Sequence, residues 1–174
     1  MWSLIEKNMY YRINEFLEDW LNETGKTTKV FSMIPEASKD IIVHPKVRAL
    51  GRLAFHIPQI IVQIGVQTGL MAPPELPEDP LPGTMTETNS LYLSIHEQMG
   101  EAVKIQWQDD MLEDEVDLYG HKWRRGDVLS LLTHHEVHHR SQMIIIMRLA
   151  GLQVPGLYGP VREDWEQLGL PIAK

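Results

Sequence analysis

Apolar residues recur at helical spacing in four long segments of this sequence. Spacings of three and four residues place such side chains on one face of a helix, which must then be covered by a partner. The segments run from Ser3 to Leu21, from Pro45 to about Gly69, from Thr84 to about Trp107 and from Asp127 to Leu149. Four amphipathic helices with little strand pattern predict an all-α fold, a four-helix bundle.

The connections between these helices carry turn and capping residues. The segment Met71–Gly83 contains five prolines, which cannot continue a helix, so we expect a long loop between the second and third helices that is able to span the bundle. Capping boxes are predicted at Ser3/Glu6 and Thr84/Glu87, and helix ends at Asn22–Gly25 and Gly151. Pro58 predicts a kink in the second helix. We also expect a short hairpin over Leu118–Trp123 and a short helix over Val161–Leu168 in the C-terminal extension.

Length and composition narrow the class of protein. The 174 residues fit a single domain covering residues 1–174. The net charge of −8 argues against nucleic acid and against an anionic membrane surface as partners, because both need a basic face. No signal-peptide start and no apolar run of membrane-spanning length occur, so we expect a soluble, cytoplasmic protein. Apolar positions on the first helix and the tryptophan-bearing tail leave a homodimer open.

The absence of cysteine limits the chemistry that the chain can perform by itself. It excludes disulfides, a cysteine nucleophile and thiolate ligands. Any metal therefore has to be held by histidines and carboxylates.

Four of the eight histidines lie within the six positions 134–139 of the fourth predicted helix. Histidines four residues apart lie above one another, which is the spacing that two imidazoles need to share a divalent metal. At about 100° per residue from Val128, His135 and His139 fall in the apolar stripe, whereas His134 and His138 lie roughly 80° to 120° from it. Burying two neutral imidazoles costs several kcal/mol unless each has a partner. Hydrogen bonds suffice for a lone core histidine, but a metal partners both at once, so we predict that His135 and His139 bind a metal.

A third ligand has to come from another helix, and two histidines are candidates. His56 lies at the edge of the apolar stripe of the second helix, and His96 shares a side with apolar residues of the third. Periodicity places His56 only slightly ahead of His96. Three histidines would leave one coordination position open, which is typical of a catalytic metal rather than a closed structural one. Gln142 and Glu136 are the candidates for supporting the ligand imidazoles, with Glu136 alternatively a surface residue.

The run His135–Gln142, on a helix that leads into Gly151–Pro160, resembles the DinB/YfiT-like family. These proteins are four-helix bundles with a three-histidine metal site. The patterns Asn8–Asn14 in the first predicted helix and Arg52–Ile57 in the second are also similar to the family. The resemblance therefore spans nearly the whole chain.

The resemblance implies both a ligand set and a class of chemistry. The ligands come from the second helix and from an i,i+4 pair on the last one, and they correspond to His56, His135 and His139. One departure is Ser141, where the family often has glycine, and it affects no ligand. Relatives include thiol S-transferases and isomerases that use low-molecular-weight thiols, as well as proteins described as metal-dependent hydrolases.

We therefore expect a divalent metal, zinc or nickel, together with a small-molecule substrate. The leading hypothesis is an enzyme that transfers an external low-molecular-weight thiol to a small electrophile, and metal-assisted hydrolysis is close behind. The alternative is a non-catalytic protein, a bundle that binds a metal or another ligand without turnover.

Residues 135–139 also match the H-E-x-x-H signature of metallopeptidases, in which the glutamate, here Glu136, is the general base. Such a peptidase would take its third ligand from a carboxylate downstream in the chain. The tail offers Glu163, Asp164 and Glu166. No clear set of strands precedes Val128 to bind a peptide, so this hypothesis ranks below the bundle.

Overall fold

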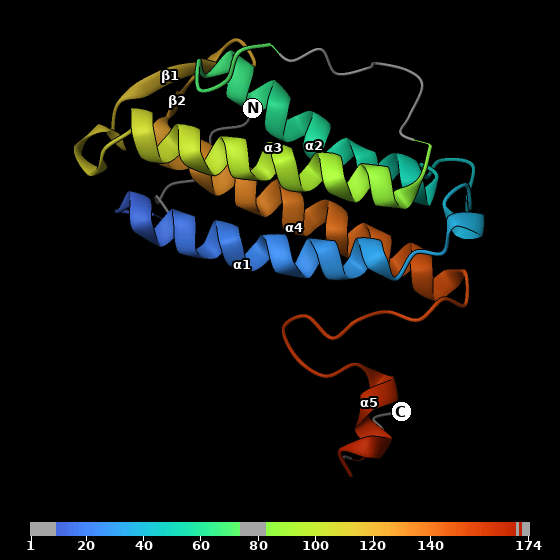
Figure 1. The fold of residues 1–174 in the computed structure, drawn as a ribbon. Coiled ribbons are helices and arrows are strands. Elements are labelled where there is room, and N and C mark those ends of the chain that lie inside the picture. Colours follow the sequence, from blue (N-terminus) through green and yellow to red (C-terminus); the bar gives the residue numbers. More distant parts are fainter. Residues whose placement is uncertain (1–9, 74–82, 170, 172–174) are drawn as a thin grey trace.

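The computed structural model describes residues 10–73, 83–169 and 171, and its main body is four long helices packed side by side (Figure 1). The helices are α1 (Ile13–Ser32), α2 (Leu50–Gln67), α3 (Met85–Gln106) and α4 (Arg125–Leu149). Both α1 and α2 pack against α3 and α4, so α1 and α2 lie diagonally across the bundle. The predicted all-α bundle is confirmed.

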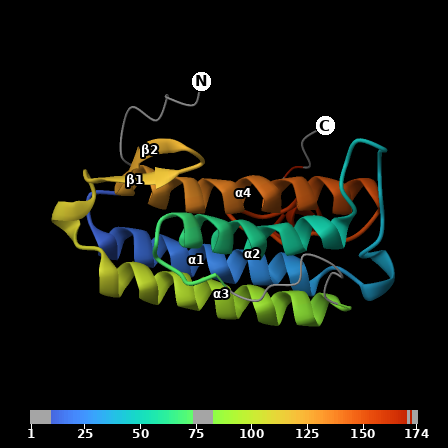
Figure 2. The ribbon, with the colours of Figure 1, turned by 90° about the horizontal axis from the view of Figure 1, so that it is seen from above.

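The directions of the helices explain the long connection in the middle of the chain. Helices α1 and α4 run one way along the bundle, and α2 and α3 run the other way (Figures 1 and 2). Because α2 and α3 are parallel neighbours, the chain between Gln67 and Met85 has to return along the length of the bundle. This is the role expected of the proline-rich segment, of which residues 74–82 lie outside the described part.

The first helix differs most from its prediction, because it begins at Ile13 and continues through Gly25 to Ser32. At its start, the carboxylate of Glu15 accepts the amide N–H groups of residues 11 and 12, which keeps both residues outside the helix. Beyond Gly25, Val30 and Phe31 are fully buried against the other helices. Their burial outweighs the cost of about 1 kcal/mol for a glycine within a helix.

The second helix begins at Leu50 rather than at Pro45. The N–H of Leu50 donates to the carbonyl of Ile41 at 3.2 Å, and that of Gly51 donates to the carbonyl of Lys39 at 2.7 Å. Residues 39–49 therefore form a loop that folds back onto the start of α2. Pro58 lies within the helix, which continues through it.

The third helix is capped as its sequence predicts. The Thr84 hydroxyl accepts the N–H of Glu87 at 3.1 Å, and the Glu87 carboxylate accepts the N–H of Thr84 at 2.9 Å. This reciprocal pair satisfies two amide groups that the first turn leaves without helical partners. The other predicted capping box, at Ser3 and Glu6, lies outside the described residues.

Replacing Thr84 with alanine should lower the free energy of unfolding by about 1 kcal/mol, the usual cost of losing such a cap. Thr86→Ala, two positions further along and also exposed, is the matched control and should be neutral because that side chain caps nothing. Urea denaturation followed by circular dichroism measures both variants. Equal effects of the two substitutions would contradict the cap's contribution.

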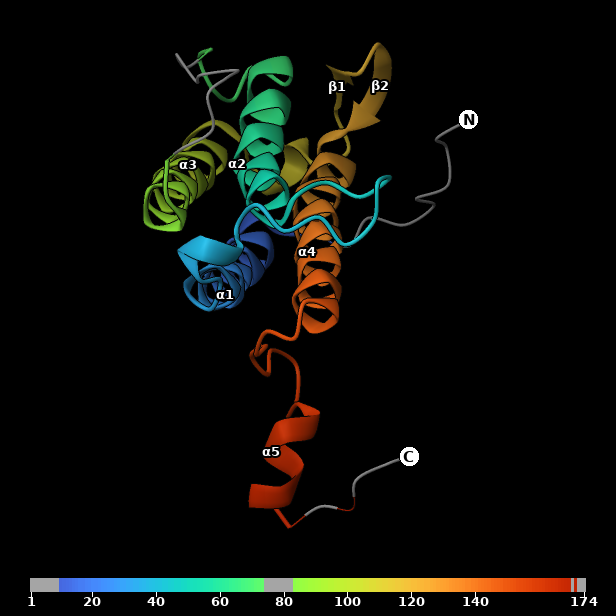
Figure 3. The ribbon, with the colours of Figure 1, turned by 90° about the vertical axis from the view of Figure 1, so that its right-hand side faces the viewer.

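A short hairpin joins α3 to α4, close to the predicted position. Strands β1 (Glu115–Leu118) and β2 (His121–Arg124) pair antiparallel through a turn in which Tyr119 and Gly120 both have positive φ, at 53° and 75°. Such a two-residue turn matches the twist of the paired strands. The hairpin packs against α2 and α4 at the end of the bundle where α4 begins (Figure 3).

The fourth helix ends where predicted, at Leu149, and Gly151 follows it with a φ of 73°. The chain then leaves the bundle on the side of α1 and α4 and forms the short helix α5 (Arg162–Gln167), close to the predicted C-terminal helix (Figures 1 and 3). Among the described residues, no helix combines the length and apolar character needed to cross a membrane.

Candidate metal centre

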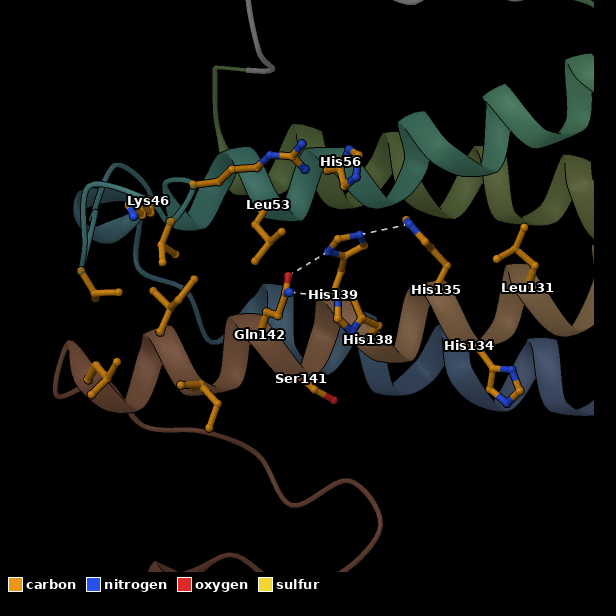
Figure 4. Close-up of a pocket in the computed structure, with 16 residues that line it drawn as sticks. Lys46, Leu53, His56, Leu131, His134, His135, His138, His139, Ser141 and Gln142 are labelled. Atoms are coloured by element: carbon orange, nitrogen blue, oxygen red, sulfur yellow. Dashed lines mark hydrogen bonds between the residues drawn. The ribbon is translucent and has the colours of Figure 1, made fainter. Parts of the chain in front are cut away.

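Three histidines from two facing helices meet between α2 and α4 (Figure 4). His56 is on α2, and His135 and His139 are one turn apart on α4. Each offers a ring nitrogen, and these nitrogens all lie within 4.8 Å of one another. The structure thus brings together the three residues that the sequence analysis selected as ligands.

The spacing of the ring nitrogens fits a single metal ion. The Nε2 atoms of His135 and His139 are 3.2 Å apart. Two nitrogens about 2.0 to 2.1 Å from a tetrahedral ion would be about 3.3 Å from each other. The ring of His56 lies 4.7 Å from that of His139 and 5.8 Å from that of His135, between centroids. The three imidazoles therefore form a donor set that fits a divalent metal.

The environment of the cluster favours neutral imidazoles. Burial is the main cause that lowers the pKa of His56 to about 4 and that of His135 to about 4, and it also lowers the pKa of His139. The neighbouring cation Arg48 acts in the same direction on all three. At neutral pH each ring thus keeps one unprotonated nitrogen, the form that binds metals.

Gln142 sets the orientation of His139. Its Oε1 accepts a hydrogen bond from Nδ1–H of His139 at 2.9 Å, which leaves Nε2 of that ring unprotonated and directed at the cluster (Figure 4). The amide Nε2 of Gln142 in turn donates to Nε2 of His138 at 2.9 Å. An outer hydrogen bond of this kind is usual for a metal-binding histidine. Gln142 therefore contacts a candidate ligand, the role proposed for it from the sequence.

The other histidines considered in the sequence do not join the cluster. His134 and His138 are exposed and line the cavity into which the cluster opens, and neither belongs to the group of three converging nitrogens. His96 is buried on α3, where its ring stacks on Trp20 at 3.7 Å between centroids and its nitrogens contact the hydroxyl of Thr24. His96 is therefore not the third member of the cluster, because its ring is packed within the core between α1 and α3.

Glu136 corrects a second expectation, because it is neither a surface residue nor a support for the ligand imidazoles. Its side chain is 2% exposed, and one carboxylate oxygen accepts hydrogen bonds from Thr27 and Tyr92, both at 2.6 Å. The other oxygen lies 3.4 Å from Nε2 of His96. Glu136 thus faces α1 and α3, on the side of α4 turned away from α2.

Sequence reasoning missed Arg140, which is 1% exposed and belongs to the same buried polar layer. Its guanidinium forms an ion pair with Glu23 and donates to the hydroxyl of Thr27 at 3.0 Å. Tyr158, from the C-terminal extension, donates to the same Glu23 carboxylate at 2.6 Å. The sequence does contain a signal for this layer, a second stripe at helical spacing on α4. The residues of this stripe are all buried: Leu129, Thr133, Glu136, Arg140, Met143 and Met147.

The peptidase arrangement is not assembled. In the described part of the chain, the group of possible metal ligands contains three histidines and no carboxylate. Glu163 is ion-paired with Arg148 instead, and Asp164 accepts the N–H of Val161 at 3.0 Å. With Glu136 turned into the core, the glutamate that should act as general base is on the wrong face.

The cluster opens into a cavity of about 940 Å³ between α2, α4 and the loop before α2. His56, His135 and His139 line its wall, together with apolar residues of α4 and the 43–48 segment. A smaller cavity of about 370 Å³ lies under the hairpin, lined by Ile64, Tyr119, His121, Trp123, Leu131 and His135. His135 and Leu131 line both cavities, so the histidine cluster lies between the larger cavity and the smaller, partly aromatic one.

Comparison with known proteins agrees with this architecture. The sequence model of the DinB family matches residues 9–171. The uncharacterized protein YrdA of Bacillus subtilis (strain 168) is 31% identical over 166 residues, which cover 95% of this chain and 99% of that protein.

Two solved structures share the fold. The crystal structure of a DinB-like protein from Bacillus cereus ATCC 10987 superposes with a TM-score of 0.79 at 34% identity, covering 86% of this chain and all of that one. A DinB-like protein from Bacillus subtilis, YjoA, has a TM-score of 0.66 at 20% identity, with 85% of this chain and all of that one covered. The second likeness concerns the fold alone.

Proposed function

Because the chain belongs to the DinB family, we propose that it is a metal-dependent enzyme whose divalent metal is held by His56, His135 and His139. The observation that carries the proposal is the meeting of three ring nitrogens within 4.8 Å at the wall of a cavity large enough for a small molecule. Three protein ligands leave a coordination position for a substrate, as in catalytic zinc sites. Zinc and nickel both suit imidazole ligands.

The reaction that we propose is transfer of a low-molecular-weight thiol to a small electrophile. A divalent ion on three neutral imidazoles supplies Lewis acidity, which favours the anionic form of a bound thiol or water at neutral pH. The chain has no cysteine, so the thiol has to be a cosubstrate. In the transfer, the thiol sulfur forms a bond to carbon, the leaving group departs with the electron pair of its own bond, and the thiol proton goes to solvent.

The residues of the chain provide position and shelter for this reaction. Gln142 keeps the His139 ring in the tautomer whose Nε2 is free to bind. The apolar and aromatic side chains of the smaller cavity, among them Trp123 and Ile64, would accept the carbon skeleton of the electrophile beside His135. The larger chamber would accept the thiol.

The test is a conjugation assay with the metal-loaded protein. Thiol consumption is followed with 1-chloro-2,4-dinitrobenzene as electrophile and a panel of small thiols. Three samples are compared: the wild-type protein loaded with metal, the wild-type protein treated with a chelator, and the His56→Ala variant after the same metal loading. We expect acceleration only with the loaded wild type and its return when metal is added back to the chelated protein. Equal rates in the loaded and the chelated protein would overturn the proposal.

Metal-assisted hydrolysis is the second candidate, since the same coordination position could hold water and the cavity is open to solvent. Hydrolysis of an activated ester such as 4-nitrophenyl acetate by the loaded protein without thiol would favour it. A site that holds metal and turns over neither class of substrate would leave the chain as a binding protein.

A further inference from the structure

Among the described residues, the charged ones that line the larger cavity are all cations. They are Lys46 and Arg48 from the loop before α2, and no aspartate or glutamate of the described ranges joins them. This is unusual in a chain with 24 acidic and 16 basic residues and a net charge of −8. The positive lining therefore does not follow from the overall composition and is a property of this cavity.

The two cations belong to the same chamber as the histidine cluster. His56, His135 and His139 line the cavity together with Lys46 and Arg48. A ligand that fills this chamber therefore has the two cations and the histidine cluster on the same wall.

These cations are available to a ligand. Neither Lys46 nor Arg48 forms an ion pair with a carboxylate in the part of the chain that the structure describes, and both side chains are exposed. By contrast, Arg140 and Arg148 are each paired with a glutamate. A guanidinium presents several N–H donors in a plane that matches carboxylate and phosphate oxygens.

We propose that the larger cavity binds a small anionic molecule, whose carboxylate or phosphate is held by Arg48 and Lys46 while its sulfur or oxygen donor reaches the three histidines. This inference rests on the proposed function for the metal and adds the chemical class of the cosubstrate, an anionic thiol. Apart from the cations, the histidines, Ser141 and Gln142, the residues of the chamber wall are apolar, with Val43, Val47 and Ile146 among them, and they fit a short carbon chain between the two ends.

The experiment measures thiol binding to the cobalt-loaded protein through the sulfur-to-cobalt charge-transfer band. The probes are 3-mercaptopropionate, 2-mercaptoethanol and cysteamine, which are anionic, neutral and cationic thiols of similar length, and thiophosphate as the phosphate-like probe. The variants are Arg48→Gln and Lys46→Gln. Arg162→Gln is the matched control, because Arg162 is an exposed arginine on α5, does not line the cavity, and its loss changes the net charge equally.

Arg48→Gln should weaken binding of 3-mercaptopropionate about tenfold, which corresponds to roughly 1.4 kcal/mol, and should leave 2-mercaptoethanol unchanged. Lys46→Gln should act in the same direction, and Arg162→Gln should affect neither probe. The more strongly affected of 3-mercaptopropionate and thiophosphate identifies carboxylate or phosphate as the preferred group. Equal weakening of the neutral and anionic thiols, or no weakening of either, would overturn the inference.

A failure of the proposed function gives a different result. If no thiol produces the charge-transfer band, the thiol chemistry is wrong, and the anion site is then tested by titrating propionate and phosphate against the visible spectrum of the bound cobalt. A spectral change that is lost in Arg48→Gln would support the anion site by itself. An unchanged spectrum in the wild type would overturn it.

Discussion

Replacing His139 with alanine should lower the affinity of the protein for zinc or nickel by roughly 100-fold or more. Loss of an outer partner of a metal-binding histidine already costs 10- to 100-fold, and removal of a ligand exceeds that. His139 has the most direct contacts in the cluster, with Nε2 at 3.2 Å from that of His135 and Nδ1 bonded to Gln142. Metal titration by calorimetry and metal content by mass spectrometry measure the effect.

The neighbouring histidines provide the controls. His134→Ala removes an exposed imidazole from the same helix and should leave the affinity unchanged. Gln142→Leu should give an intermediate loss, since the His139 ring keeps its nitrogen and loses only the hydrogen bond that orients it. Equal metal content in His134→Ala and His139→Ala would be incompatible with the proposed ligand set.

Replacing Arg140 with methionine should lower the free energy of unfolding by about 3 to 5 kcal/mol, which is typical when one partner of a buried ion pair is removed. The substitution leaves Glu23, which is 7% exposed, without its guanidinium partner. Urea denaturation measures the change. Arg148 is on the same helix as Arg140 but forms an exposed ion pair, with Glu163 of α5, so Arg148→Met should have a far smaller effect.

A second substitution separates the charge from the packing. Glu23→Gln together with Arg140→Met removes both charges of this pair and should recover part of the lost stability, because position 23 then no longer holds a buried carboxylate without its guanidinium. Glu136, which lies 3.8 Å from Arg140, keeps its hydrogen bonds from Thr27 and Tyr92, so the recovery should be partial. If the two residues were not coupled, the losses in free energy of unfolding from the two single substitutions would simply add. A double variant that is less stable than Arg140→Met by the full cost of Glu23→Gln alone would therefore contradict the coupling.

The pH dependence of stability should depend on the same carboxylate. Burial raises the pKa of Glu23, but hydrogen bonds from Lys26, Tyr158 and Arg140 outweigh burial and lower the pKa overall. The folded protein therefore holds this proton less tightly than the unfolded chain does, so Glu23 contributes stability above its unfolded pKa and loses it as the pH falls through the lower folded value. In Arg140→Met this acid-side loss should shift to higher pH.

Much of the candidate site can be derived from helical periodicity. His135 and His139 are identified because two polar residues four apart replace apolar ones on a buried stripe, and this argument involves only one helix. Gln142 follows from the same geometry. The choice between His56 and His96 could not be made in this way, because both lie on partly apolar faces and only the packing of four helices decides which face meets which.

The fate of Glu136 and Arg140 shows the same limit. Charged residues are usually found at the surface, yet these two lie on a second buried face of α4, which is directed at α1 and α3. Their burial is possible only because Thr27, Tyr92 and Glu23 on those helices provide hydrogen bonds and an opposite charge. Such partners are distant in the sequence and leave no local signal.

The sequence by itself determined the four helices, the cap at Thr84, the turn after α4 and the paired histidines, because each depends on interactions within a few residues of the chain. Only the tertiary structure decided that His56 completes the cluster, that α1 continues past Gly25, and that the cations of residues 46 and 48 share a cavity with the histidines. Those features depend on which helix faces are buried against one another, and burial is a property of the assembled bundle.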